Sequence, residues 1–395
     1  MSSTSLEPAL LASPPAGGKP EAPIIIRVAR RHGVSPLRQL VQMMQLRWSQ
    51  SRVSPREYYA AGLFRPTLDA AARGAFVGTL GNLRLNRATT SAASRQMTSF
   101  HADKLMLAAL LSGFGVPTPE TQAVFAAQRQ FGALPVLRDA GQIATFLRSD
   151  ARYPVFAKPL RGSLSVGSTR IDAFDAASDT VLLGSGRSLD VTVLAEEIAT
   201  SHPTGYLFQT RILPHPEMAA VAGTALGTVR VVTVADKDGP QVLYAVWKLP
   251  SRNALSDSSW QEGNMQALVD IDSGRVLRCG CGTGLEVGVV ERHPDSGLPI
   301  PGFQLPHWDA VMQTARAAHS LLPECGILGW DIGITAEGPV VLEANNNPFH
   351  MLYQRAADRG ILNEEFLPVF RRLRASAAAA NRRQRKGRLR RLFRR

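Results

Sequence analysis

The pattern of apolar and polar positions predicts helices in the first part of the chain. Large apolar side chains recur at helical spacing between residues 36 and 62, and a second helical pattern runs between residues 68 and 85. The first set is Leu37, Leu40, Val41, Met44 and Leu46. Residues 1–22 are rich in Ser, Pro, Ala and Gly and are expected to be disordered. We therefore expect a helical region over residues 23–100, which serves as packing or as a cap beside a substrate.

The clearest strand pattern in the second half of the chain is a hairpin over residues 327–345. Two apolar runs flank a short stretch of turn-forming residues. If the loop spans residues 336–338, counting back along both strands places Asp331 opposite Glu343, with the carboxylates about 5 Å apart. Like charges at that distance repel, so such a pair indicates a cation between them.

Strand alternation adds a third oxygen ligand to this pair. Glu343 and Asn345 project to one face of their strand, and Asp331 shares that face. Oxygen ligands suit an Mg²⁺ ion that also binds substrate phosphates better than they suit zinc. The alternative is a surface hairpin whose acids point into water. A loop one residue shorter or longer would produce that alternative, because it would reverse the faces.

Two lysines lie in contexts that suit phosphate binding. Lys104 lies in the first turn of a helix that Asp103 can cap, although a single lysine there is by itself an ordinary surface residue. Lys158 ends an apolar strand before the Ser- and Gly-rich loop 162–168. The N–H groups and hydroxyls of such a loop can surround phosphate oxygens, and the lysine adds positive charge. The spacing is not that of a P-loop, because Lys158 precedes the loop.

Two further cations, Arg230 and Lys248, lie within predicted strands. Residues 228–234 alternate cleanly, so Arg230 shares a face with Thr228 and Val232. An arginine in a strand is usually a solvated edge residue, but in a cleft it would meet a carboxylate or a phosphate. The sequence does not decide between a solvated edge and a cleft for Arg230 and Lys248.

The positive charge of the chain is concentrated at its C-terminus. The 395 residues carry a net charge of +13, which at first suggests a nucleic-acid partner. Residues 371–395 contain 12 Lys and Arg and no acid, which leaves +1 for residues 1–370. The basic character therefore belongs to a tail and not to the folded body.

The tail over residues 371–395 has three interpretations. Leu389, Leu392 and Phe393 recur at helical spacing among arginines, so residues 376–395 can form an amphipathic helix on an anionic membrane surface. Nonspecific nucleic-acid binding is less favoured and would depend strongly on salt. A solvated, disordered extension is the default for a run of like charges.

The cysteines and the N-terminus bear on the cellular compartment. Three cysteines are too few for a disulfide framework, and zinc-site spacing is missing, so Cys279, Cys281 and Cys325 are predicted to be free thiols. The N-terminus lacks a secretory pattern, and no apolar run reaches the roughly 18 residues of a membrane span. We expect a cytoplasmic protein, peripheral at most to the inner membrane surface.

Four motifs in succession resemble the signatures of the ATP-grasp superfamily. They are the helix that Lys104 opens before GVPTP, FAKP at Lys158, TVRVVT at Arg230 and GWDIGITAEGPVVLEANNNP at the hairpin. The longer strings FQTRILPHPE and HPDSGLPIPGFQLPHW resemble one branch, the sugar-transfer associated ATP-grasp proteins, which are related to α-L-glutamate ligases. The resemblance covers approximately residues 55–370.

The resemblance implies an α+β fold in which two subdomains, over residues 101–370, grip ATP between them. Lys104 and Lys158 would contact the ATP phosphates, and the segment from Gln209 to Ile212 would form the adenine-side hinge. The hinge commonly carries an acid for the ribose, whereas this chain has Thr210 there. We expect Glu197 to take its place. The loop residues that would close over the phosphates are Gly162, Ser163, Gly167 and Ser168.

The resemblance also implies an activity. Asp331, Glu343 and Asn345 would hold one or two Mg²⁺ ions, and Arg230 and Lys248 would steady the oxygens of an acylphosphate. The implied enzyme is an ATP-dependent carboxylate–amine ligase, acting on an amino-acid, another small-molecule or a saccharide-linked substrate. The alternatives are a kinase that phosphorylates a hydroxyl and a non-catalytic ATP-binding protein.

Overall fold

The computed structural model describes most of the chain. The described residues are 10, 23–92, 94, 103–162, 165–251, 254 and 263–392, with side chains described up to residue 386. The disorder predicted for residues 1–22 lies outside this part of the chain except at Leu10, which is buried. Ser163 also lies outside the described residues.

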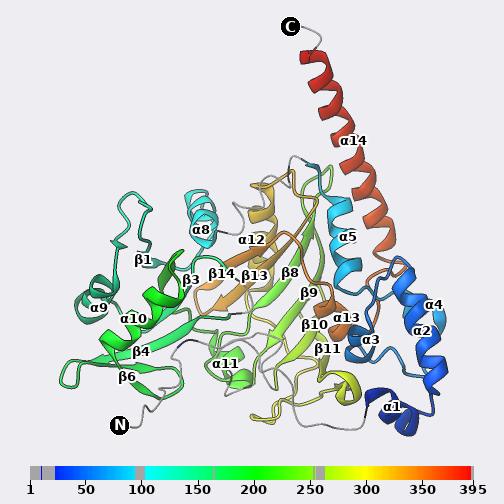
Figure 1. Cartoon of the computed structure of the whole chain (residues 1–395), viewed down its shortest axis with the longest axis horizontal. Helices are drawn as coiled ribbons and strands as arrows, with labels where there is room; N and C mark the ends of the chain where they lie inside the picture. Colours follow the sequence, from blue (N-terminus) through cyan, green and yellow to red (C-terminus); the bar gives the residue numbers. More distant parts are fainter. Residues whose placement is uncertain are drawn as a thin grey trace.

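Helices make up the N-terminal region, as the sequence predicts (Figure 1). They are α1 (Ile24–His32), α2 (Pro36–Trp48), α3 (Pro55–Ala60), α4 (Ala70–Gly74) and α5 (Thr79–Thr89). Ser35 and Ser54 cap α2 and α3, because their side chains accept hydrogen bonds from the N–H groups of Arg38 and Glu57. These caps determine where the two helices begin.

Helix α2 turns its apolar pattern outward. Gln39 and Gln42 are buried on its inner side, where the hydroxyls of Tyr59 and Tyr58 donate hydrogen bonds to their Oε1 atoms at 2.9 and 2.5 Å. A buried amide that keeps hydrogen-bond partners loses little on leaving water. The expected packing role is therefore wrong for four exposed residues, which are Leu37, Leu40, Val41 and Met44.

The first sheet has the strand order β2-β1-β7-β3-β4-β5-β6. Its strands are β1 (Thr121–Phe125), β2 (Val136–Leu137), β3 (Val155–Pro159), β4 (Thr169–Asp175), β5 (Thr180–Leu183), β6 (Ser188–Asp190) and β7 (Tyr206–Thr210). Helices α9 (Ala140–Ser149) and α10 (Val191–Ser201) pack on one face, around Phe146 and Phe208. On the opposite face, Leu105 of α8 (Lys104–Gly113) packs against Leu207 of β7.

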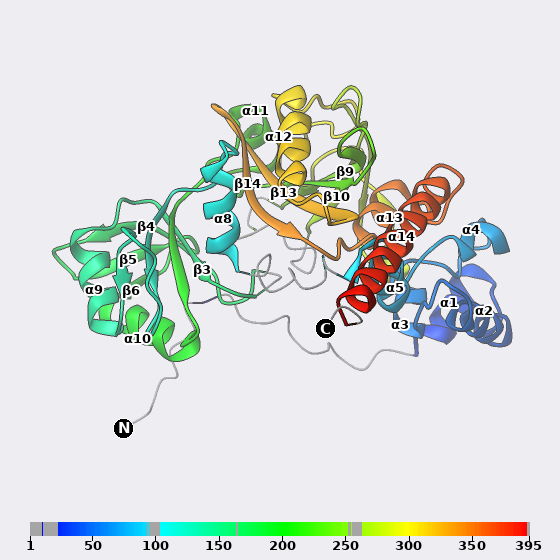
Figure 2. The ribbon, with the colours of Figure 1, turned by 90° about the horizontal axis from the view of Figure 1, so that it is seen from above.

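The second sheet has the order β12-β11-β10-β9-β8-β13-β14. Its strands are β8 (Val229–Val234), β9 (Gln241–Leu249), β10 (Met265–Val269), β11 (Val276–Cys281), β12 (Gly288–Val289), β13 (Ile327–Thr335) and β14 (Gly338–Asn345), and η1 (Gly284–Glu286) precedes β12. One face packs on α11 (Pro216–Ala222) and α12 (Trp308–Ser320), and the other on α13 (Met351–Ala357) and α14 (Leu367–Leu392). The fold is α+β, as predicted (Figure 2). The three cysteines are free, also as predicted.

Helix α14 joins the body of the protein to its basic tail. Phe370, Leu373 and Ala377 are buried, and the first two belong to the core that α14 shares with α5, α13 and the second sheet. The helix continues to Leu392, so the interpretation of a disordered extension is wrong for residues 371–392. In the part of the chain that is described, no helix combines the length and apolar character that crossing a bilayer requires.

Candidate active site

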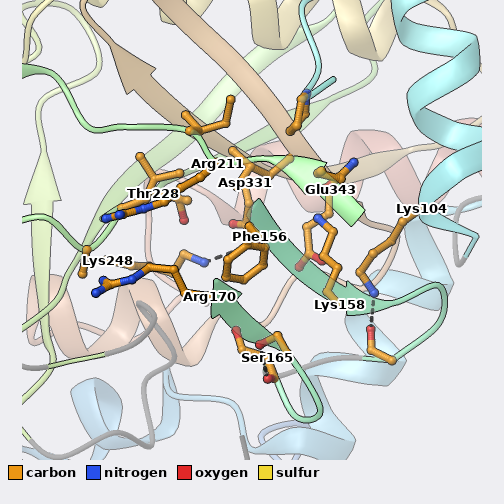
Figure 3. A pocket seen from close by; sticks show the side chains of 18 of the residues that line it. Lys104, Phe156, Lys158, Ser165, Arg170, Arg211, Thr228, Lys248, Asp331 and Glu343 are labelled. Atoms are coloured by element: carbon orange, nitrogen blue, oxygen red, sulfur yellow. Dashed lines mark hydrogen bonds and ion pairs between the residues drawn. The ribbon is translucent and has the colours of Figure 1, made fainter. Parts of the chain in front are cut away.

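A cavity of 320 Å³ lies between the two sheets (Figure 3). β3, β4 and β7 contribute residues from the first sheet, and β8, β9, β13 and β14 contribute residues from the second. Most of the site residues predicted from the sequence line this cavity. They are Lys104, Lys158, Gly162, Ser168, Gln209, Ile212, Arg230, Lys248, Asp331, Glu343 and Asn345. The fold therefore brings distant segments together around one space.

The β13–β14 hairpin places Asp331 opposite Glu343, as predicted. The predicted loop was wrong, because Thr335 pairs with Gly338 and leaves a loop of only two residues. A β-bulge beside Asp331 then places an extra residue, Leu342, in β14. The shorter loop and the bulge shift the register by one residue each in opposite directions. The two errors cancel, so the pairing of the carboxylates is preserved.

Two cations hold the Asp331 carboxylate. Arg230 Nε and Nη2 donate to its two oxygens at 2.6 and 2.9 Å, and Lys248 Nζ lies 3.2 Å from Oδ2. Burial alone would raise the pKa of Asp331, but Arg230 and Lys248 hold it well below its ordinary value. Asp331 therefore stays negatively charged. The contact of Arg230 and Lys248 with an acylphosphate stays a prediction, since their partner in the structure is Asp331.

Glu343 has the opposite electrostatic environment. Burial and the charge of Asp331 raise its pKa, and Lys104 and Lys248 offset this only in part. Two residues further along β14, the Nδ2 atom of Asn345 is buried and has no hydrogen-bond partner among the described residues. Its N–H groups can donate to an acceptor such as a phosphate oxygen. The two opposed carboxylates, together with the Asn345 side-chain oxygen, form a set of oxygen donors that fits Mg²⁺.

Lys104 enters the cavity from the first turn of α8. Asp103 caps this helix as predicted, because its side chain accepts a hydrogen bond from the N–H of Met106 at 3.2 Å. Lys104 Nζ donates to the carbonyl of Gly162 at 2.8 Å, so the lysine contacts the Ser- and Gly-rich loop. Burial lowers the pKa of Lys104, and the charge of Glu343 opposes this shift. Lys104 therefore connects the loop to the carboxylate side of the cavity.

Lys158 reaches the cavity because β3 alternates. Val155 and Ala157 pack into the core of the first sheet, so Phe156 and Lys158 face the other way, into the cavity. Only 9% of Lys158 is exposed. Burial and the neighbouring charge of Lys104 lower the pKa of Lys158 to about 8. A bound phosphate would stabilise the charged form of this lysine.

Glycines shape the loop that follows β3. Gly162 and Gly167 have φ angles of 137° and 76°, a region that only glycine enters freely. The hydroxyl of Tyr206 donates to the carbonyl of Gly167 at 2.6 Å. The Ser168 hydroxyl donates to the carbonyl of Ser165 at 2.5 Å, so it is engaged within the loop. Gly167 does not line the cavity. Its carbonyl instead holds the loop to Tyr206.

The sugar-transfer associated ATP-grasp family has a model that matches residues 86–367. The chain belongs to this family. The match covers well over half of the 395 residues and confirms the resemblance of the sequence motifs to this branch of the ATP-grasp superfamily. Among curated proteins, none matches the chain.

Several solved structures are similar to this ATP-grasp chain. The D-alanine-D-alanine ligase from Coxiella burnetii is 11% identical with a TM-score of 0.42, over 80% of this chain and 70% of that one. The ADP complex of purK, an N5-carboxyaminoimidazole ribonucleotide synthetase, is 11% identical with a TM-score of 0.37, over 64% and 47%. The L-amino acid ligase from Bacillus licheniformis is 13% identical with a TM-score of 0.33, over 63% and 41%. The chain thus spans less than half the length of the last two.

The segment predicted to form the adenine-side hinge of this ATP-grasp chain lies at the cavity, but Glu197 does not. Gln209 and Ile212 line the cavity, whereas α10, which carries Glu197, packs on the opposite face of the first sheet. There Glu197 Oε1 accepts a hydrogen bond from the N–H of Leu10 at 3.0 Å. The expectation that Glu197 replaces the ribose acid at Thr210 is therefore corrected, because the sheet separates Glu197 from the cavity.

Arg170 and Arg211 line the cavity of this ATP-grasp protein. The sequence analysis did not identify Arg170, and it included Arg211 only as part of the segment from Gln209 to Ile212. Both contact Asp172 Oδ1, at 3.0 and 3.2 Å. Arg170 pairs across the ladder with Phe156, two residues before Lys158, so alternation along β3 and β4 is the signal that would have found Arg170. Among the described residues the lining cations are Lys104, Lys158, Arg170, Arg211, Arg230 and Lys248, against Asp331 and Glu343. This excess of positive charge suits a polyphosphate ligand.

Proposed function

We propose that this protein is an ATP- and Mg²⁺-dependent carboxylate–amine ligase, acting on an amino-acid, another small-molecule or a saccharide-linked substrate. One observation carries the proposal. Asp331 and Glu343 of the second sheet lie in the same cavity as Lys104 and Lys158, which come from α8 and the first sheet. A divalent cation and a polyphosphate need these two kinds of partner side by side. Membership of the ATP-grasp family supports the same assignment.

In this proposal the ATP phosphates lie against the two lysines. Lys104 and Lys158 neutralise phosphate charge, and the loop containing Gly162 and Ser168 covers the phosphates. The adenine lies at the hinge formed by Gln209 to Ile212. The low pKa of Lys158 supports this placement. Burial and the charge of Lys104 destabilise the charged lysine in the free protein, and an anionic phosphate would stabilise it.

Glu343, Asn345 and Asp331 would hold Mg²⁺. When bound, the ion would supply charge neutralisation to the transferring phosphoryl group. Asp331 would be the weaker ligand, because Arg230 and Lys248 already engage both of its oxygens. Glu343 would be the principal ligand, since burial and the charge of Asp331 raise its pKa and the neighbouring lysines offset this only in part.

The proposed reaction requires alignment and charge neutralisation, and no covalent nucleophile from the protein. A carboxylate oxygen of the first substrate attacks the γ-phosphorus, and ADP leaves. The amine of the second substrate then attacks the acyl carbon, and inorganic phosphate leaves. Arg230 and Lys248 would stabilise the acylphosphate oxygens from the second sheet, because both reach the cavity beside Asp331.

Calorimetric titration of ATP with and without Mg²⁺ tests the site. We expect the wild-type protein to bind ATP with a clear dependence on the metal. Glu343→Gln should lose that dependence and weaken binding by roughly tenfold or more, because it removes the principal ligand. Glu196→Gln, which changes an exposed carboxylate on α10, is the matched control and should bind like the wild type. Equal binding by the wild type and Glu343→Gln would contradict the metal assignment.

Product analysis tests the reaction. We expect ADP release to require a carboxylate and an amine together, with an amide as the product. A phosphomonoester formed from a hydroxyl acceptor would show a kinase instead. If ATP binds with the metal but no carboxylate–amine pair causes turnover, the protein is a non-catalytic nucleotide-binding protein. Either result would overturn the ligase proposal while keeping the ATP site.

A further inference from the structure

Helix α2 presents an apolar face to solvent. Leu37, Met44 and Trp48 are 72%, 62% and 76% exposed, and Leu40 and Val41 are about half exposed. Successive residues of a helix are rotated by about 100°, so these five side chains fall within an arc of roughly 100°. The opposite arc holds the buried residues of α2. The exposed face is therefore one continuous stripe and not a scatter of single residues.

The chain around this stripe is strongly basic. Between residue 22 and residue 56 it contains no aspartate or glutamate. The same segment contains Arg27, Arg30, Arg31, Arg38, Arg47, Arg52 and Arg56. Although residues 1–370 are close to neutral as a whole, this segment carries a local excess of seven positive charges. An apolar stripe with a basic border is the pattern of a helix that lies in a membrane interface.

The start of the basic helix α14 lies near the end of α2. A second cavity, of 380 Å³, is lined by Trp48 at the end of α2, by Arg52 in the loop that follows, by Arg84 from α5, and by Arg371 and Arg374 from α14. No carboxylate lines it among the described residues. Both views of the ribbon place α1, α2 and α14 on the side of the molecule away from the first sheet (Figures 1 and 2). Trp48 ends the apolar stripe and also lines this cavity, so the stripe and the arginines of α14 meet there.

We propose that α2 and α14 form a docking surface for an anionic lipid bilayer. The stripe of Leu37, Met44 and Trp48 enters the boundary between headgroups and acyl chains. Tryptophan at one end of the stripe suits that depth, because its ring is apolar and its N–H is polar. The arginines that line the second cavity contact lipid phosphates, which bind guanidinium groups through paired hydrogen bonds.

The combination of apolar and basic groups favours a bilayer over the other partners. A nucleic acid would bind the arginines, but its phosphate backbone would leave Leu37 and Met44 in water. A second copy of the chain would cover the apolar stripe, but a two-fold contact would bring the same arginine-rich surfaces together and they would repel. An anionic bilayer satisfies both kinds of side chain at once.

Co-sedimentation of the full-length protein with lipid vesicles tests this proposal. The vesicles contain phosphatidylcholine alone or with about one third phosphatidylglycerol. We expect binding to the anionic vesicles that is roughly tenfold stronger and that weakens as salt is added. A triple variant, Leu37→Ser, Met44→Ser and Trp48→Ser, should bind the anionic vesicles at least roughly tenfold less tightly.

A control variant separates this stripe from apolar exposure in general. Phe114→Ser with Leu182→Ser removes two exposed apolar side chains from α8's C-terminus and from β5 and should bind like the wild type. Equal binding by the triple variant, or equal binding to neutral and anionic vesicles, would overturn the proposal. So would a wild-type dimer that the triple variant converts to a monomer. Tighter binding to duplex DNA or RNA than to anionic vesicles would overturn it in favour of a nucleic acid.

The fluorescence of Trp48 provides a second test, because its quenching by lipid depends on the depth of the ring in the bilayer. Of the other four tryptophans, Trp247, Trp308 and Trp330 are buried in the core, so lipid cannot reach them, and Trp260 lies outside the described residues. In a Trp260→Phe background, lipids brominated near the headgroup should quench the fluorescence, and adding Trp48→Phe should remove that quenching while the protein still binds the vesicles. Unchanged quenching in Trp48→Phe would contradict insertion of α2.

Discussion

Asp331 and Glu343 are partners across one ladder, the first buried and the second partly buried, and their pKa values shift in opposite directions. Burial acts to raise both pKa values, but Arg230 and Lys248 lower the pKa of Asp331, whereas the charge of Asp331 adds to the rise at Glu343. The difference arises because both cations approach from β8 and β9, on the side of β13 that faces away from β14. The cavity therefore holds one compensated and one uncompensated carboxylate. The second is the one that a metal ion would stabilise.

Lys158 leads to a prediction at the same scale. Its pKa is about 8 in the free protein, below its ordinary value, and a bound phosphate raises it. ATP binding at pH 8 should therefore take up about half a proton, and affinity should fall as the pH rises above 8, where the free protein loses this charge. Calorimetry in buffers with different ionisation enthalpies measures the uptake.

Lys158→Arg is the matched variant for this experiment. Arginine keeps its charge throughout this pH range, so the variant should bind ATP without the proton uptake that Lys158 causes. Uptake of the same size in Lys158→Arg would show that another group titrates on binding.

The loop between β3 and β4 depends on elements that lie outside the cavity. Tyr206 of β7 donates a hydrogen bond to the carbonyl of Gly167, and a Cβ atom at Gly167 would lie 2.6 Å from the ring of His202. Lys104 of α8 fixes the other end of the loop through the carbonyl of Gly162. The loop is therefore positioned by α8 and β7 as much as by its own sequence.

Gly167→Ala should distort this loop, because of both the positive φ of 76° and the contact with His202. We expect ATP affinity to fall by roughly tenfold and the free energy of unfolding to fall by about 1–2 kcal/mol. Gly186→Ala is the control, since Gly186 has a φ of 83° with nothing within 4 Å of an added Cβ. It lies between β5 and β6, so it should lose stability but keep ATP affinity.

Helix α14 packs together with α5 against the second sheet. Phe370 is 1% exposed and belongs to a core that includes residues of α5, β8, β9 and α13. The same helix carries the basic residues of the proposed docking surface. On α14 the buried packing residues Phe370 and Leu373 therefore alternate with Arg371 and Arg374, the exposed residues of the proposed docking surface.

Phe370→Ala should lower the free energy of unfolding by roughly 3–5 kcal/mol, because it leaves a cavity in this core. Arg371→Ala, at the adjacent exposed position, should change stability by about 0.5 kcal/mol or less. Urea unfolding measures both variants. A small effect of Phe370→Ala would contradict a packing role of α14 in the core that it shares with α5 and the second sheet.

The sequence by itself determined the features that depend on local chemistry. Asp103 caps α8 and places Lys104 in its first turn. The pairing of Asp331 with Glu343 was also predicted, but only because the shorter loop and the β-bulge offset each other. Such rules act over a few residues, so the order of residues is enough to apply them. Membership of the ATP-grasp family followed in the same way, because its motifs are short strings in a fixed order.

Only the tertiary structure decided which distant groups meet and which faces are covered. It paired Arg230 and Lys248 with Asp331, separated Glu197 from the cavity by a sheet, and left the apolar face of α2 in solvent while Gln39 found partners inside. The physical reason is common to these cases. Burial depends on which elements pack against a surface, and neither the spacing nor the hydrophobicity of a segment specifies its neighbour.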